Sequence, residues 1–341
     1  MYANNALTSK AKAMYGFRLR KKDYDELVKK QSVSEIASYL KNETAYKEAL
    51  KDIRENMVHR GQLELLIQRE SFMKQQRLVR YVFAGDKEFY ELNTYKEEID
   101  QILSCIKAIM NNDYDDFVHD MPLFMSKQMT FDFNQLLSVK NIEDFKQVIV
   151  KTRYGKDVMP FLERNPIDYT GLTMKLRRTY YERMSMLIQK QFHGKTKKNL
   201  MEIFDTRMEL SDICKIYRMK EYFHADKGDI QRQLLGLRQR INEKTLQKLL
   251  DAKDGEEVLA ILESSPYHLY TSNEEFIYIE YYCHGFMYHL GKRFMYFSSD
   301  APVIYLCYTL LDEIEVENII AIIEGVRYNV EADKINKLIL D

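Results

Sequence analysis

The sequence predicts an all-α protein, and three observations support this fold class. Glycine and proline are scarce, at 12 and 5 of 341 residues, so few positions force a helix to end. No stretch keeps up the alternation of Val, Ile or Thr with polar residues that is typical of strands. Two helical patterns instead recur three times along the chain. With 45% hydrophobic and 30% charged residues, the balance is that of an ordinary soluble protein able to bury a large core.

The first repeated pattern is a short capped helix that ends in a tyrosine. It occupies residues 32–46 (SVSEIASYLKNETAY), 141–154 (NIEDFKQVIVKTRY) and 254–267 (DGEEVLAILESSPY). Each copy begins with a helix-capping residue and has an acid three positions later, which predicts a capping box or a close variant: Ser32 and Glu35, Asn141 and Asp144, Asp254 and Glu257. Each ends with Thr or Ser, any residue, then Tyr, and these tyrosines are 108 and 113 residues apart: Tyr46, Tyr154, Tyr267.

The second repeated pattern is an amphipathic helix that opens with a glutamate. It covers residues 98–107 (EIDQILSCIK), 209–218 (ELSDICKIYR) and 315–324 (EVENIIAIIE), with apolar residues at helical spacing. The opening acids are 111 and 106 residues apart: Glu98, Glu209, Glu315. Because both patterns share a pitch of about 110 residues, they predict three similar helical units. We expect boundaries near 112 and 226, which gives units 1–112, 113–226 and 227–341.

Two further stretches also fit helices. Residues 6–30 predict one long amphipathic helix or a pair of helices. Residues 229–250 (DIQRQLLGLRQRINEKTLQKLL) are highly charged, with leucines at helical spacing, and predict a helix as well. Since no low-complexity linker separates these segments, we expect the units to pack side by side.

Several function classes are disfavoured by composition. The net charge of −1 gives no reason to expect nucleic-acid binding. The residues at the start have no apolar signal core, and the apolar run 303–311 (VIYLCYTLL) is far shorter than the roughly 20 residues that cross a bilayer. No cysteines stand at metal-ligand spacing, and each lies in an apolar helical pattern, which predicts reduced core thiols of a cytoplasmic protein: Cys105, Cys214, Cys283, Cys307.

The segment HGKTKK (193–198) looks like the end of a phosphate-binding loop. Such a loop needs a glycine five residues before Gly194, and that position holds Gln189. The loop also needs a strand leading into it, whereas the preceding residues predict a helix. We therefore expect a basic connection between two helices, with phosphate binding through Lys195, Lys197 and Lys198 as the alternative.

Four other polar segments contain residues that could form a site. His284 and His289 are five apart, which does not suit two metal ligands on one helix face, and the acidic segment 111–117 lacks the glycine and late glutamate of a calcium loop. The basic segment 17–30 contains acids and predicts a solvated helix face more than a phosphate or acidic-partner site. Segment 176–184 (LRRTYYERM) fits either a packed tyrosine pair with exposed arginines or an interaction surface. No residue is assigned as catalytic, cofactor-binding or metal-binding, and no cofactor is expected.

Taken together, the repeats resemble a known family. Segment 302–339 is similar to the C-terminal part of the rotary ATPase subunit called C in V- and A-type complexes of bacteria and archaea, and d in eukaryotes. The residues that carry this resemblance are Pro302, Tyr305, Glu315, Asn318, Ile319, Ile322 and Tyr328. Segment 209–223 resembles the family's middle copy, segment 2–19 its opening helix and segment 39–46 its first Tyr-ending helix. The chain departs from the family at Thr8 and Lys10, where arginines are usual, which leaves individual contact residues open.

The resemblance implies three pseudo-threefold-related helical bundles that form a funnel. It also implies a non-catalytic subunit on the cytoplasmic face of a membrane. That subunit would join the membrane rotor ring of proteolipid subunits to the central stalk, and so link ATP turnover to proton or sodium transport. The expected partners are the ring and stalk subunits, without nucleic acid or direct nucleotide binding. A helical phosphate- or nucleotide-binding protein that uses 193–198 remains the alternative.

Overall fold

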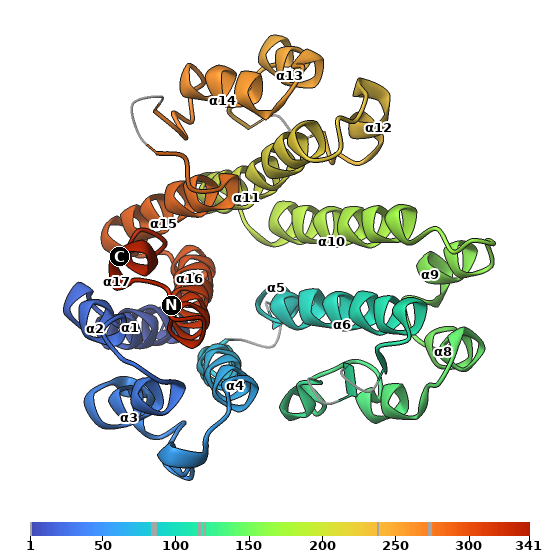
Figure 1. Cartoon of the computed structure of the whole chain (residues 1–341). Coiled ribbons are helices and arrows are strands. Elements are labelled where there is room, and N and C mark those ends of the chain that lie inside the picture. Colours follow the sequence, from blue (N-terminus) through green and yellow to red (C-terminus); the bar gives the residue numbers. More distant parts are fainter. Residues whose placement is uncertain (1, 83–86, 115–116, 119–120, 237–238, 272–274) are drawn as a thin grey trace. The chain divides into compact units, whose positions relative to one another are not determined.

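The computed structural model describes residues 2–82, 87–114, 117–118, 121–236, 239–271 and 275–341. They form two compact units, of which unit 1 comprises residues 1–82 and 193–341 and unit 2 comprises residues 83–192. Across these described ranges the regular elements are all helices, so the predicted all-α class is confirmed. Figure 1 labels the helices along the chain.

Unit 1 combines the first helices of the chain with the last ones. Its N-terminal elements are α1 (Tyr2–Gly16), α2 (Lys21–Leu27), α3 (Val33–Glu43), η1 (Ala45–Lys47), η2 (Glu55–Met57) and α4 (Arg60–Val79). Its C-terminal elements are α11 (Gly194–Glu221), α12 (Lys227–Arg232), α13 (Glu243–Asp251), α14 (Gly255–Glu263), α15 (Ile279–Phe297), α16 (Ala301–Arg327) and α17 (Ala332–Asn336). The stretch 6–30 is therefore a pair of helices, one of the two predicted forms.

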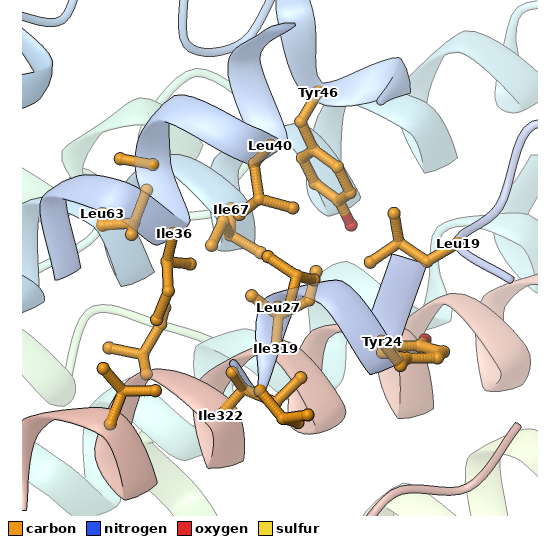
Figure 2. Packing of buried hydrophobic residues seen from close by; sticks show 14 of the residues in the cluster. Leu19, Tyr24, Leu27, Ile36, Leu40, Tyr46, Leu63, Ile67, Ile319 and Ile322 are labelled. Carbon is orange, nitrogen blue, oxygen red and sulfur yellow. The ribbon is translucent and has the colours of Figure 1, made fainter. Parts of the chain in front are cut away.

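Helix α16 is the centre of unit 1. It packs against α1, α4, α11 and α15, and nearly every residue between Ala301 and Leu311 is buried. The apolar run 303–311 is thus a core helix segment. Figure 2 shows Ile319 and Ile322 of α16 among Leu27, Ile36 and Ile67 from the first helices. This core therefore joins both ends of the sequence. Burial of each such side chain stabilises the fold by about 1.5–3 kcal/mol.

Unit 2 is a smaller set of helices built from continuous sequence. Its elements are α5 (Lys87–Tyr90), α6 (Leu92–Asn111), η4 (Leu123–Met125), η5 (Phe133–Ser138), α8 (Ile142–Ile149), α9 (Gly155–Leu162) and α10 (Tyr169–Gln191). Helices α6 and α10 pack side by side, and α9 packs against both α8 and α10 (Figure 1).

The predicted caps form with one difference in detail. Ser32, Asn141 and Asp254 each accept a hydrogen bond from the backbone N–H of the acid three residues later. The acids reach back, but to the N–H of the residue before the cap: Glu35 to Gln31, Asp144 to Lys140 and Glu257 to Lys253. The caps thus fix where α3, α8 and α14 begin, as expected from their side-chain oxygens.

The prediction of one helix over residues 229–250 is wrong for the middle of this stretch. Helix α12 ends at Arg232 and α13 begins at Glu243, and Gly236 between them has a φ of +74°. Five of the described backbone N–H groups of this connection bond to carboxylates on α11: those of Leu235 and Gly236 to Asp212, and those of residues 239–241 to Glu209. Because buried carboxylates take these donors, they are not available to continue a helix.

Candidate functional site

Three buried tyrosines each donate a hydrogen bond to a buried glutamate. The pairs are Tyr46 with Glu315, Tyr154 with Glu98 and Tyr267 with Glu209. All six residues are at most 6% exposed. These residues are the tyrosines that end the first repeated pattern and the acids that open the second. The sequence located both partners of every pair but did not indicate that they would meet.

A hydroxyl two residues before each tyrosine fixes its position. Thr44, Thr152 and Ser265 each donate to a backbone carbonyl at the end of the preceding helix, over 2.6–2.7 Å. The same oxygen accepts from the backbone N–H of the tyrosine, over 3.2 Å in all three copies. The Thr/Ser-x-Tyr ending is therefore a local turn in which one hydroxyl satisfies both a helix carbonyl and the tyrosine N–H.

Each glutamate also accepts backbone N–H groups from a distant segment. Glu315 accepts from Leu19 over 2.8 Å, Glu98 accepts from Thr130, and Glu209 accepts from residues 239–241 over 2.9–3.1 Å. A buried carboxylate is tolerated only when donors surround it. Each one thereby ties a long helix to a Tyr-ending turn and to an irregular segment.

A cation lies beside every pair, but its role differs. Lys74 is 3.6 Å from Glu315 and lies 4.7 Å from the Tyr46 ring centre. Arg153 pairs with Glu98 at 2.5 Å, and its guanidinium is 5.2 Å from the ring of Tyr154. At the third pair, the guanidinium of Arg240 lies 6.0 Å from the ring of Tyr267 and pairs with Glu202 at 3.1 Å. Of these three cations, only Arg153 is next to its tyrosine in the sequence, so only its place beside the pair could be predicted from a local pattern.

The Glu315 pair contains one more acid than the Glu98 pair. Asp312, one turn earlier on α16, is 2.9 Å from Lys74 and accepts from Ser71 over 2.6 Å. Burial raises the pKa of Glu315, Lys74 lowers it and Asp312 raises it, with the net effect upward. Burial alone would lower the pKa of Lys74, but Asp312 and Glu315 together raise it, so Lys74 stays protonated at neutral pH.

The basic segment 193–198 forms the first turn of α11. The element before it is helix α10, as predicted, rather than the strand that a phosphate-binding loop requires. Gly194 has a φ of +57°, and the Thr196 hydroxyl donates to Asp300 over 3.0 Å. Lys195 and Lys198 are exposed.

The two candidate histidines and the four cysteines lie on helices. His284 pairs with Glu317 at 3.0 Å, and His289 is exposed beside Tyr288. All four cysteines are free thiols, with Cys105, Cys283 and Cys307 buried and Cys214 half-buried. Burial raises the pKa of Cys105 to about 12, so this thiol is unreactive at neutral pH. Across the described ranges, no three metal-ligating side chains gather as a metal site would need.

The three remaining candidate segments contain packed or helix-ending residues. In 17–30, Asp23 is buried and accepts from the Arg20 N–H and the Tyr39 hydroxyl, so this part of the face is not solvated. In 176–184, Tyr180 stacks on Tyr95 with ring centres 6.2 Å apart, which supports the packed reading for this residue. In 111–117, Asn112 ends α6 with a φ of 59°, as a helix boundary would, and residues 115–116 lie outside the described residues.

Exposed aromatic side chains gather at the ends of long helices of unit 1. Phe17 follows α1, Tyr222 and Phe223 follow α11, Phe297 ends α15 and Tyr328 follows α16. Phe223 and Phe297 are 73% and 87% exposed. Where such side chains form one contiguous patch, they are typical of a surface that contacts another protein. No helix in the described residues combines the length and the apolar content that crossing a bilayer requires.

The described residues thus form an all-helical protein in which buried carboxylates link distant segments of the chain. The comparison with known families makes this class more specific. The family described as ATP synthase (C/AC39) subunit matches residues 7–338, and the chain therefore belongs to this family of rotary ATPase subunits. The search of curated proteins gave no match.

Proposed function

We propose that this chain is a non-catalytic rotor subunit that joins the central stalk of a V/A-type ATPase to its membrane rotor ring. The observation that carries the proposal is the family match over residues 7–338. In this role the subunit sits peripherally on the cytoplasmic face and contacts proteolipid ring subunits and stalk subunits. It links ATP turnover to proton or sodium transport without binding a nucleotide or a cofactor itself.

The Tyr–Glu pairs support this proposal because torque transfer requires a stiff part. Each pair joins segments that are distant in sequence, and Tyr46 and Glu315 are 269 residues apart. Hydrogen bonds to a charged group contribute about 1.5–3 kcal/mol each, and close-packed helical interiors compress little. Such links resist shear between helices under load.

The threefold organisation is part of the same proposal. The turns at Tyr154 and Tyr267 each bond to the glutamate helix that precedes them in the sequence, and the turn at Tyr46 bonds to the last such helix, that of Glu315. We propose that each pair marks the centre of one bundle. The boundaries near 112 and 226 and the funnel arrangement of the bundles stay predictions.

The first test is recovery of partners from native membranes. The tagged full-length chain is captured in mild detergent from cells that lack the untagged protein, and recovered proteins are identified by mass spectrometry. Recovery of both ring and central-stalk subunits is expected. Recovery of neither, from membranes whose ATP-driven ion transport is intact, would contradict the proposal.

Variants at the exposed helix ends make this test sharper. Phe223→Ser and Phe297→Ser are expected to reduce recovery of partners and ion transport per ATP hydrolysed, while the variants remain folded. Met186→Ser is the matched control, because Met186 is 55% exposed but lies within α10 and not at a helix end. If all three variants behave like the wild type, the helix ends do not carry the contacts.

A further inference from the structure

Unit 1 contains a cavity that the proposed coupling role does not use. Its volume is about 270 Å³, and its walls come from the end of α1, the connection to α2, and helices α15 and α16. This size suits a small organic molecule and is below the usual range of drug-sized sites. Glu315 lies on one wall, so the cavity adjoins the first Tyr–Glu pair.

The cavity wall carries more positive than negative side chains. Arg18, Arg20, Lys21 and Lys292 line it, against the carboxylates of Glu315 and Asp341. Lys21 lies 3.7 Å from Asp341. Within the part of the chain that the structure describes, Arg18, Arg20 and Lys292 have no carboxylate within ion-pair distance. Three of the cations that line the cavity therefore have no carboxylate to balance their charge, which favours an anionic ligand.

Two of these cations are held in place by neighbouring tyrosines. The Arg18 guanidinium lies 4.0 Å above the Tyr15 ring and donates to the Tyr15 carbonyl over 3.1 Å. The Lys292 ammonium lies 4.6 Å from the Tyr288 ring centre and 3.2 Å from its hydroxyl. Their positions on the wall are thus set before any ligand arrives, which lowers the entropic cost of binding.

The hydroxyl of Tyr15 is the independent sign that a ligand belongs here. Tyr15 lines the cavity and is only 8% exposed, yet no described residue bonds to its buried hydroxyl. Burial raises the pKa of Tyr15 to about 12, so the group is a hydrogen-bond donor at neutral pH. A buried polar group without a partner costs about 1–3 kcal/mol, which a ligand oxygen would remove.

The Glu315 carboxylate, which also lines the cavity, has a different preference from the cations. One oxygen accepts from Tyr46 and lies 3.6 Å from Lys74, whereas the other accepts from Leu19 and retains a second lone pair. A ligand hydroxyl can donate there, whereas a ligand anion would be repelled. The ligand therefore needs an anionic end for the cations and a hydroxyl for Glu315.

We propose that this cavity binds a small phosphate ester that carries a hydroxyl, of the glycerophosphate type. Its phosphate contacts Arg18 and Lys292 and accepts from Tyr15, while its hydroxyl faces Glu315. The same chemistry is found in a soluble polyol phosphate and in the headgroup of phosphatidylglycerol, and the experiment distinguishes these two sources.

The test uses the purified full-length chain and two probes. Glycerol 3-phosphate is titrated by calorimetry, and vesicles of phosphatidylcholine with or without phosphatidylglycerol are used in co-sedimentation. Saturable binding of glycerol 3-phosphate indicates a soluble ligand, and binding to phosphatidylglycerol vesicles alone indicates the headgroup. In either case Arg18→Gln and Lys292→Gln should each weaken binding about tenfold, because each removes one charge-assisted contact.

Two further variants separate a built site from general charge attraction. Lys22→Gln removes an exposed cation on the same helix as Lys21 but away from the cavity, and should change binding less than twofold. Tyr15→Phe should weaken binding about fivefold and leave the melting temperature without ligand unchanged, because its hydroxyl has no described partner to lose. Absence of binding to both probes, or equal weakening by Lys22→Gln and Lys292→Gln, would overturn the proposal.

Discussion

The sites around Glu315 and Glu98 share a plan but differ in their balance of charge. At Glu98 one acid meets one arginine, and the Arg153 side chain is 32% exposed. At Glu315 a single lysine lies between two acids, and Lys74 and Asp312 are only 14% and 4% exposed. The Tyr-ending turn is the same in both, down to the 3.2 Å bond between the tyrosine N–H and the threonine hydroxyl.

This difference separates what the repeat specifies from what each copy adds. The turn and the Tyr–Glu bond are local geometry, which short sequence patterns can preserve. The source of the cation differs between the copies, because Lys74 at Glu315 comes from α4 and Arg153 at Glu98 comes from the turn itself. We therefore expect the hydroxyl turns to contribute alike, whereas removal of the cations should affect the two sites very differently.

Removal of the cation should give the largest difference between the sites. Lys74→Met leaves two buried acids without their shared partner and should lower the free energy of unfolding by about 3–5 kcal/mol. Arg153→Met affects one acid, and water reaches the arginine, so a loss of about 1–2 kcal/mol is expected. Urea unfolding followed by far-ultraviolet circular dichroism measures both, since the chain has no tryptophan.

Lys51→Met serves as the control for loss of a lysine. Lys51 lies 3.6 Å from Glu48, and both side chains are well exposed, so the urea midpoint should hardly move. Equal losses from Lys74→Met and Arg153→Met would show that the extra acid at Asp312 has no energetic effect.

The pH dependence of stability should show a smaller effect that is specific to Glu315. Its folded-state pKa lies above the ordinary value of 4.5, so the folded chain binds this proton more tightly than the unfolded chain. The contribution of Glu315 to stability therefore falls as the pH rises from about 4.5 to its folded-state pKa. Wild type should lose stability relative to Glu315→Gln across this window.

Unfolding at several pH values between about 4 and about 8 measures the difference between the two proteins. Lys74 stays protonated throughout this range, because its pKa is raised. The exposed Glu256→Gln is the control, and its curve should run parallel to that of wild type. A Glu315→Gln curve that is also parallel to wild type would contradict the expected linkage.

Loss of the turn hydroxyls should give the smallest effects, and effects of similar size. Thr44→Ala, Thr152→Ala and Ser265→Ala each remove one hydroxyl that makes two backbone bonds, at a cost of about 0.5–1.5 kcal/mol. Ser264→Ala is the matched control, since Ser264 is exposed and bonds one carbonyl. A spread of several kcal/mol among the three would show that the turns are not equivalent.

The sequence predicted the elements of these sites but not their assembly. Caps at Ser32, Asn141 and Asp254, the all-α class and the repeated tyrosines and glutamates all follow from local spacing. The bond between Tyr46 and Glu315 spans 269 residues, and no local pattern encodes such a contact. Lys74 was missed for the same reason, because its partners lie on α16.

The error over residues 229–250 has a related cause. Leucines at helical spacing there predict a helix, but Glu209 and Asp212 on α11 bond the backbone N–H groups of the connection. Tertiary contacts of this kind override local propensity. The sequence reveals them only when the acids that make them are recognised as buried.

The core that joins both ends of the chain also affects how the protein is made. The apolar faces of α2, α3 and α4 pack on residues 316–339, which leave the ribosome much later. At 5–20 residues per second, those faces stay uncovered for roughly tens of seconds during synthesis. The first helices therefore complete their fold only when the last helix arrives, which gives chaperones a defined interval in which to protect them.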